Sequence, residues 1–248
     1  MTTDPLAPLL ELADVAPAAQ QARERFDEAL GHRALRRHGG QVAAEVSLRS
    51  AVASAALEGY TYDREAVRAG TVTDPVLQGA LRVAGALPGL IELWPKAPRQ
   101  ALARLHVLAA RDVVPEPELG RPIADPVVGA RLDNLAALVA GGTRVSPLVL
   151  AAVVHGELLA LRPFAGPSGV VARGAARLVL LASGTDPRGL LPVDVGHHER
   201  EPEYVGAAGA FATGTPDGLR SWLRHYMSAV EVGAAELTRI GDEVLAAS

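Results

Sequence analysis

Residues 161–173 read LRPFAGPSGVVAR, a proline-, glycine- and serine-containing turn between two apolar segments of helical composition. The N-terminus of a helix presents unpaired N–H groups and a partial positive charge, so Ser168 and Gly169 at the start of the second helix would suit an anion. Arg162 precedes the turn, and Arg173 follows Gly169 by one helical turn on the same side. The stretch therefore predicts either a small-anion site or a plain connection in which Arg162 caps the first helix.

The composition of the chain indicates a helical protein with an aliphatic core. Of 248 residues, 49% are hydrophobic and only 4% aromatic. Alanine and leucine are abundant, and both favour helices. The formal net charge of −4 argues against a dedicated nucleic-acid binder. The absence of cysteine excludes disulfides, thiol catalysis and zinc–thiolate sites.

The N-terminal sequence is acidic and lacks the basic region of a secretion signal. No stretch approaches eighteen uninterrupted apolar residues, so we expect no membrane span. These observations favour a soluble, cytoplasmic protein. Abundant Ala, Arg, Gly and Pro beside a single lysine, Lys96, are typical of GC-rich bacterial genomes.

Helical periodicity recurs along the chain, and no segment alternates as a strand would. The predicted helical segments are 16–38, 41–58, 74–94, 97–111, 127–141, 146–161, 169–184, 203–212 and 216–246. Gly39 and Gly40 are expected to end the first of them. The sequence thus predicts one all-α domain of about eight or nine helices, with 146–161 and 169–184 at its centre.

Two further segments are predicted to be loops. Residues 112–126 contain four prolines and a glycine, which favours a loop or a short β-hairpin near 115–127. His197 and His198 lie between prolines and glycines among several glutamates. Without helical spacing to direct these side chains at a metal, a solvated loop is the expected structure there.

The quoted stretch resembles the signature of Fic-domain proteins. That signature has His-Pro-Phe, two variable residues, Gly-Asn-Gly-Arg, and a last arginine three positions later. Residues 150–164 resemble the family's central helix, in which a histidine often stands seven residues before the motif, as His155 does. Residues 117–123 resemble the segment that leads into the target-docking flap, and 103–111 resemble the preceding helix.

A second motif lies far upstream. SAALEGY, residues 54–60, matches the family's inhibitory motif, with Ser54, Glu58 and Gly59 in its defining positions. The resemblance therefore implies a single Fic-like domain over 1–248. Its N-terminal helical extension, about 1–60, would carry the inhibitory helix, and its Fic-like core would span about 75–230.

The resemblance implies a chemistry whose residues are only partly present. Fic proteins transfer AMP or another phosphate-containing group to a protein hydroxyl, with the motif histidine as general base and an acidic residue holding Mg²⁺. Arg162 stands in the histidine position and keeps its proton, so it cannot be that base. Gly166 replaces the acid. Pro167, Ser168 and Val170 also depart from the motif, whereas Pro163, Phe164, Gly169 and Arg173 match it. We therefore expect no catalytic residue, no metal and no AMP transfer.

The first functional prediction is a degenerate Fic-like protein that binds or regulates. Its residual pocket for an anion or nucleotide phosphate would be formed by Arg162, Ser168, Gly169 and Arg173. The alternative is an enzyme with metal-independent chemistry on a phosphorylated or carboxylate ligand, in which His155 substitutes as acid or base. A hydrogen-bonded core histidine is the other interpretation of His155. The same core role is expected of His106. A third possibility is a structural protein that pairs with a protein partner or as a homodimer.

The retained Glu58 and Arg173 imply an ion pair. In the family this pair keeps the γ-phosphate of the nucleotide out of the site. With catalysis lost, a structural salt bridge between two helices is the first interpretation. The second is that Glu58 still gates an anion site. No cofactor is predicted beyond a bound nucleotide or phosphate.

Overall fold

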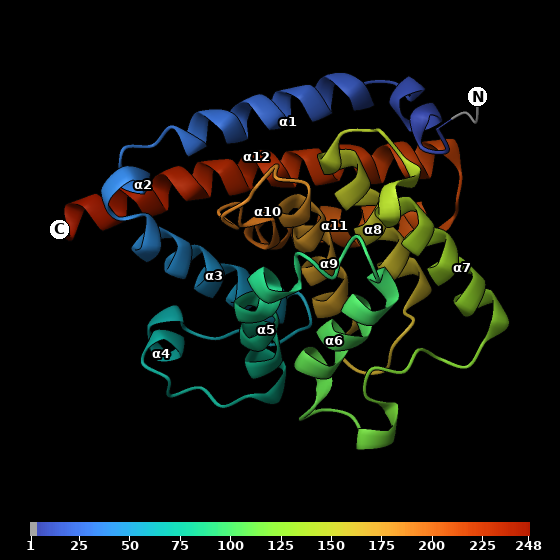
Figure 1. Ribbon diagram of the computed structural model, residues 1–248. Helices are drawn as coiled ribbons and strands as arrows, with labels where there is room; N and C mark the ends of the chain where they lie inside the picture. Colours follow the sequence, from blue (N-terminus) through green and yellow to red (C-terminus); the bar gives the residue numbers. More distant parts are fainter. Residues whose placement is uncertain (1–3) are drawn as a thin grey trace.

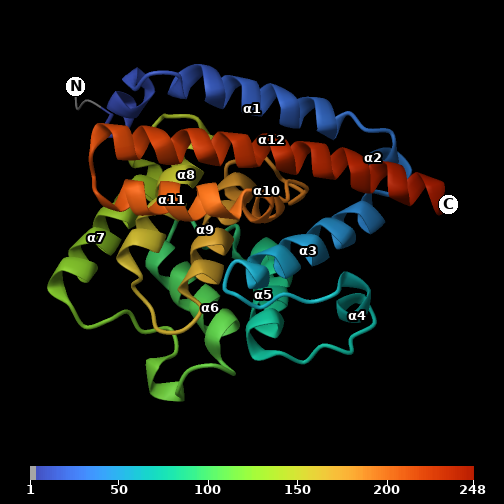
Figure 2. The same ribbon diagram turned by 180° about the vertical axis from the view of Figure 1, so that it is seen from behind.

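The computed structural model describes residues 4–248, and every regular element in this range is a helix (Figures 1 and 2). The elements are η1 Ala7–Glu11, α1 Val15–Leu30, α2 Ala34–Arg37, α3 Gly39–Ala56, α4 Arg64–Arg68, α5 Pro75–Ala86, η2 Leu87–Leu90, α6 Pro98–Ala110, η3 Glu116–Glu118, α7 Pro126–Ala137, η4 Leu138–Gly142, α8 Pro147–Leu161, α9 Ser168–Ala182, α10 Val193–Glu199, α11 Glu201–Ala212 and α12 Pro216–Ala246. The all-α prediction is confirmed. None of these helices is long and apolar enough to cross a bilayer.

Helices α8 and α9 pack against each other at the centre of the molecule. A helix that is apolar all round must be buried on most sides, and α8 has this composition. Ser146 caps its start by accepting a hydrogen bond from the N–H of Leu148, and Pro147 occupies the first helical position. The prediction of two central helices around residues 161–173 is therefore confirmed.

The long helix α12 runs beside α1 and covers α10 and α11 on its other side (Figures 1 and 2). The N-terminal half of α12 supplies two fully buried aromatic side chains, Trp222 and Tyr226. The indole N–H of Trp222 donates to the carbonyl oxygen of Ala152 at 2.7 Å. This bond satisfies a buried polar group and fixes α12 against α8.

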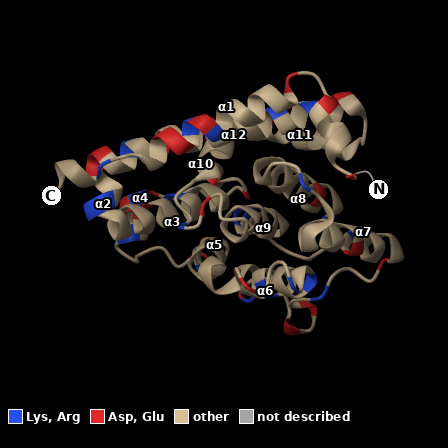
Figure 3. Cartoon of the chain, turned by 45° about the horizontal axis from the view of Figure 1, so that its top comes forward, with Lys and Arg blue, Asp and Glu red and all other residues tan. Residues whose placement is uncertain are grey.

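Helix α3 is held to α12 by charged side chains. Acidic and basic residues are interspersed along the outer helices (Figure 3). Arg49 of α3, which is 5% exposed, donates to Glu45 at 2.6 Å, to Glu236 at 2.7 Å and also to Glu243. A buried cation is tolerated when each of its nitrogens donates to a carboxylate in this way. The network fixes the position of α3, whose C-terminal end leads to Glu58.

Three local predictions were wrong. The expected helix over 16–38 is interrupted, and Gly39 begins α3 instead of ending a helix. A side chain at Gly39 would displace the guanidinium of Arg188, which lies against the start of α3. Residues 193–199 form α10, not a solvated loop, and His197 is 1% exposed.

The helix count also exceeds the eight or nine expected, since residues 4–248 contain twelve α-helices. Helices α2, α4 and α10 have 4, 5 and 7 residues, too few for a period of about 3.6 residues to be recognised. Residues 115–127 contain η3, irregular backbone and the first two residues of α7, and the β-hairpin considered there is not present. Their prolines remove backbone donors that a hairpin would need.

The contact between α5 and α6 provides a matched test of packing. A Cβ at Gly79 would overlap the carbonyl oxygen of Ala109, so Gly79→Ala should lower the free energy of unfolding by about 1–3 kcal/mol. Gly85 lies on the same helix with no atom near its missing Cβ. Gly85→Ala should therefore be neutral or stabilising by up to about 1 kcal/mol. Urea unfolding measures both, and equal effects would contradict the close approach of the two helices.

Candidate functional site

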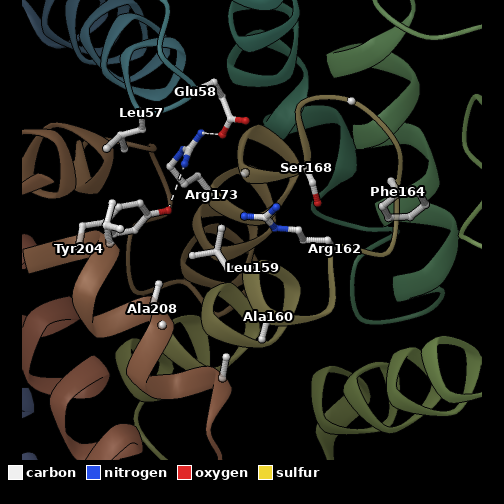
Figure 4. Close-up of a pocket in the computed structure, with 15 residues that line it drawn as sticks. Leu57, Glu58, Leu159, Ala160, Arg162, Phe164, Ser168, Arg173, Tyr204 and Ala208 are labelled. Carbon is white, nitrogen blue, oxygen red and sulfur yellow. Dashed lines mark hydrogen bonds and ion pairs between the residues drawn. The ribbon is translucent and has the colours of Figure 1, made fainter. Parts of the chain in front are cut away.

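A cavity of about 600 Å³ lies where α8 ends and α9 begins (Figure 4). Its walls come from the segment after α3, from α8 and α9, and from α11. The polar side chains on these walls are Glu58, Arg162, Ser168, Arg173 and Tyr204. The apolar ones are Leu57, Leu159, Ala160, Phe164, Val205, Ala208 and Ala212. The structure thus brings together the predicted residues Glu58, Arg162, Ser168, Gly169 and Arg173 around one cavity.

Arg162 ends α8 in the left-handed region, with φ 43° and ψ 58°. Its N–H donates to the carbonyl oxygen of Leu158 at 3.0 Å, so the backbone caps the helix as one interpretation expected. The side chain does not take part in this cap. It lines the cavity, is exposed, and has no hydrogen-bond or ion-pair partner among residues 4–248 (Figure 4). Because left-handed backbone is unfavourable for residues other than glycine, Arg162 is held there at a cost.

His106 of α6 packs against the turn that follows Arg162. The imidazole stacks on Phe164 with ring centroids 4.7 Å apart. Its Nε2–H donates to the carbonyl oxygen of Ala165 at 2.9 Å, and its Nδ1 accepts from the N–H of Gly120 at 3.0 Å. Burial lowers the pKa of His106, consistent with this neutral form. His106 is therefore a hydrogen-bonded core histidine, as expected.

The start of α9 is less open to an anion than the sequence predicted. The N–H of Ser168 donates to Gly166 at 2.7 Å, and that of Val170 donates to Pro167 at 3.2 Å. A Cβ at Gly169 would overlap the carboxylate of Glu58, which therefore lies over this helix start. The hydroxyl oxygen of Ser168 is buried without a hydrogen-bond partner in the described part of the chain. Side chains, more than backbone donors, are thus left to hold a ligand.

Arg173 is 2% exposed, and its donors are engaged within the protein. It donates to the hydroxyl of Ser54 at 2.8 Å, to the carbonyl oxygen of Ser54 at 2.9 Å, to Glu58 at 2.6 Å and to Tyr204 at 3.1 Å. Burial alone would lower the pKa of Arg173, but Tyr204, Glu58 and Asp194 together raise it. The ion pair expected between Glu58 and Arg173 is present, and the guanidinium of Arg173 is bonded to protein groups.

His155 does not line the cavity. It is 1% exposed, and its Nε2 lies 3.1 Å from the hydroxyl of Tyr204. Burial, with the charges of Arg173 and His225, holds the pKa of His155 well below its usual range. His155 is therefore a hydrogen-bonded core histidine, which was one of the two interpretations of the sequence. Tyr204 lies between it and the cavity.

The histidine behind it, His197, belongs to a buried aromatic cluster. Its Nδ1 lies 3.0 Å from Nε2 of His225, and its ring stacks on that of His225. Burial lowers the pKa of His225 to about 4. These rings pack against Trp222 and Tyr226. His197 is therefore part of the core that supports α10 and α11.

Sequence reasoning missed the contribution of α11. Tyr204, Val205, Ala208 and Ala212 line the cavity, yet they come from a segment that carries no recognisable motif. Their spacing of one and two helical turns marks a common face, but nothing in the sequence indicates which helix that face meets. Asp194, 3.9 Å from Arg173, was missed for the same reason.

Comparisons with known proteins identify the fold. No family model matches the sequence, and no curated protein matches it. Among solved structures, a Fic family protein from Desulfovibrio desulfuricans G20 is 23% identical with a TM-score of 0.70, covering 89% of this chain and 74% of its own. Fic-1 from C. elegans, residues 134–508, is 19% identical with a TM-score of 0.71, covering 97% and 76%.

A Fic domain containing signaling protein from Bacteroides thetaiotaomicron VPI-5482 is 12% identical with a TM-score of 0.63, covering 91% of this chain and 97% of its own. The match in each case extends over most of both chains. The protein therefore has the Fic-domain fold, and the resemblance seen in residues 161–173 is confirmed at the level of the fold.

The buried ion pair gives two variants with unequal expected effects. Arg173→Leu removes a cation from between Glu58 and Asp194 and should cost about 3–5 kcal/mol of unfolding free energy. Glu58 is 21% exposed, and Arg173 keeps Ser54 and Tyr204 without it, so Glu58→Gln should cost about 1 kcal/mol or less. Chemical denaturation compares them. Similar losses in both variants would contradict the central role of Arg173.

The histidine cluster predicts acid sensitivity. His225 has a pKa of about 4 when folded, against about 6.5 for an ordinary histidine. The unfolded chain therefore binds a proton first, and stability falls as the pH drops through this window. At pH 5 the loss from this residue is about 2 kcal/mol relative to pH 8. In His225→Gln the difference between urea unfolding at the two pH values should shrink by that amount. An unchanged difference would refute the assignment.

Proposed function

We propose that this protein is a Fic-like binding protein that holds a small anionic ligand in the cavity between α8, α9 and α11 and does not transfer AMP. The observation that carries this proposal is the free guanidinium of Arg162. When residues 161–173 are compared with the Fic signature, this arginine stands in the position of the histidine that acts as general base. A fixed positive charge inside a lined cavity is suited to binding and unsuited to proton abstraction.

The missing reactive groups support the absence of ordinary transfer. General base catalysis contributes about 10²–10⁴ in rate, and Arg162 cannot supply it. Gly166 faces the cavity without a carboxylate for a hard cation. Glu58 is the carboxylate on the cavity wall, and it is bonded to Arg173. These residues do not fit a site for Mg²⁺, so no step is assigned to one.

The contacts of Arg173 support a structural role for its pair with Glu58. Arg173 contacts Ser54, Glu58 and Tyr204, and so connects the end of α3 and the segment after it to α9 and α11. Removing the pair would change the shape of the cavity as well as its charge. A protein partner or homodimer remains a prediction from the sequence.

A second candidate function is metal-independent chemistry on a phosphorylated or carboxylate ligand. It is favoured by the contact between Tyr204, which lines the cavity, and His155 behind it. In that case the hydroxyl of Tyr204 would donate a proton to the ligand, and His155 would act on the ligand only through its contact with Tyr204. Burial raises the pKa of Tyr204, which keeps its proton on the phenol at neutral pH. Turnover of a bound ligand that is lost in Tyr204→Phe would support this candidate.

The binding proposal predicts the outcome of two assays. Incubation with ATP labelled on the α-phosphate should transfer no label to the protein itself or to proteins of a cell lysate. Inorganic phosphate or AMP should bind in calorimetric titration, and Arg162→Gly should weaken that binding at least about tenfold, because a charge-assisted contact is lost. Glycine suits the left-handed backbone at this position, so the variant should fold at least as stably as the parent.

Arg104→Ala is the matched control. Arg104 is an exposed arginine of α6 away from the cavity, and its loss changes the net charge equally. It should leave binding unchanged. Transfer of label, or equal binding by the parent and Arg162→Gly, would refute the proposed function.

A further inference from the structure

The charges on the cavity wall indicate how much negative charge a ligand should carry. The charged side chains that line it are Glu58, Arg162 and Arg173. Glu58 and Arg173 compensate each other at 2.6 Å, and each nitrogen of the Arg173 guanidinium donates to a protein group. One positive charge, that of Arg162, is therefore left for a ligand. A second or third negative charge would face the carboxylate of Glu58 without a partner.

The free hydrogen-bonding groups also fit a single anionic group. The unpartnered hydroxyl of Ser168 lies on the same wall as the guanidinium of Arg162 (Figure 4). Because the Ser168 hydroxyl oxygen is buried, its side chain must rotate toward Arg162 before the two groups can contact two oxygens of one carboxylate, sulfonate or phosphate. The N–H groups of Ser168 and Val170 are used within the turn, and Glu58 lies over the start of α9. Among the described residues, a chain of phosphates would find no second unpaired cation on this wall.

Much of the remaining cavity wall is apolar. Helix α11 contributes Val205, Ala208 and Ala212, and α8 contributes Leu159 beside the position of Arg162. Val205 is 61% exposed, so apolar surface faces water at the mouth of the cavity. Small side chains on α11 leave room for a flat or extended apolar group. The volume of about 600 Å³ suits a ligand of drug size.

We infer that the cavity takes an amphipathic monoanion: one anionic group bound by Arg162 and Ser168, attached to an apolar body that lies against α11. This inference rests on the proposed function and specifies its ligand. It excludes nucleoside polyphosphates as the preferred ligands. The free energy of binding comes from both parts, so neither a small inorganic anion nor a neutral apolar compound should bind as well.

A fluorescent probe of this class tests the inference. The probe is 8-anilino-1-naphthalenesulfonate, which carries one negative charge on an apolar body. It should bind and be displaced by octanoate. Its neutral counterpart N-phenyl-1-naphthylamine, inorganic phosphate and ATP should each bind at least about tenfold more weakly than the probe. Circular dichroism and unfolding curves for every variant show whether it is folded, so that probe fluorescence from unfolded protein is recognised.

Four variants, one of them a control, separate the two parts of the proposed contact. Arg162→Gly should weaken binding of the probe at least about tenfold while leaving binding of the neutral counterpart unchanged. Ala208→Leu should fill the space beside the apolar wall and weaken binding of the probe. Ala130→Leu, at an exposed position of α7 outside the cavity, should leave binding of the probe unchanged. Glu58→Gln should improve binding of ATP relative to the probe, because it removes the facing negative charge.

The outcomes distinguish this inference from the proposed function. If phosphate or ATP binds more tightly than the probe and loses affinity in Arg162→Gly, the amphipathic ligand class is refuted and the anion-binding function stands. If the probe binds Arg162→Gly and the parent equally, the inference is refuted, because the charge is not recognised. If none of the anions binds the parent, both proposals fail.

Discussion

The buried guanidinium of Arg173 is the interaction on which the candidate site depends. An arginine removed from water must have its donors satisfied, and here Ser54, Glu58 and Tyr204 satisfy them. These partners belong to α3, the segment after it, and α11, whereas Arg173 itself belongs to α9. One side chain therefore sets the distances between three walls of the cavity. A side chain at residue 169 would displace the carboxylate of Glu58 from its place beside Arg173.

The two arginines of residues 161–173 have opposite environments, although the sequence presents them alike. Arg173 lies inside α9 and points at α3, so the packing of helices removes it from water. Arg162 follows the last turn of α8 in a left-handed conformation, which directs its side chain away from the helix and into the cavity. The division of roles follows from backbone position. Arg173 within the helix is paired with protein groups, whereas Arg162 at the turn has no partner among the described residues.

Much of this arrangement could be predicted from the sequence, because the signals were local or matched a known pattern. The apolar segments on either side of residues 161–173 identified the central helices, and the motif around Ser54 and Glu58 identified the partner of Arg173. Features set by packing could not be predicted. Helix α10 is too short to show a period, and its flanking prolines and glycines favoured a loop. Tyr204 has no motif, and its role arises because α11 folds back onto α8 and α9.

The imidazole of His106 has a consequence for how genetic variation in this protein would be interpreted. It bonds to Ala165 in the cavity turn, 59 positions away, and to Gly120, while Ile123 bonds through its N–H to the carbonyl oxygen of Pro163 at 2.8 Å. The segment from Gly120 to Ile123 lines none of the cavity, yet it shares hydrogen bonds with the turn that does. In a screen for loss of the proposed ligand binding, substitutions in this surface segment would therefore group with those of the cavity. A map drawn only from lining residues would misclassify them as neutral.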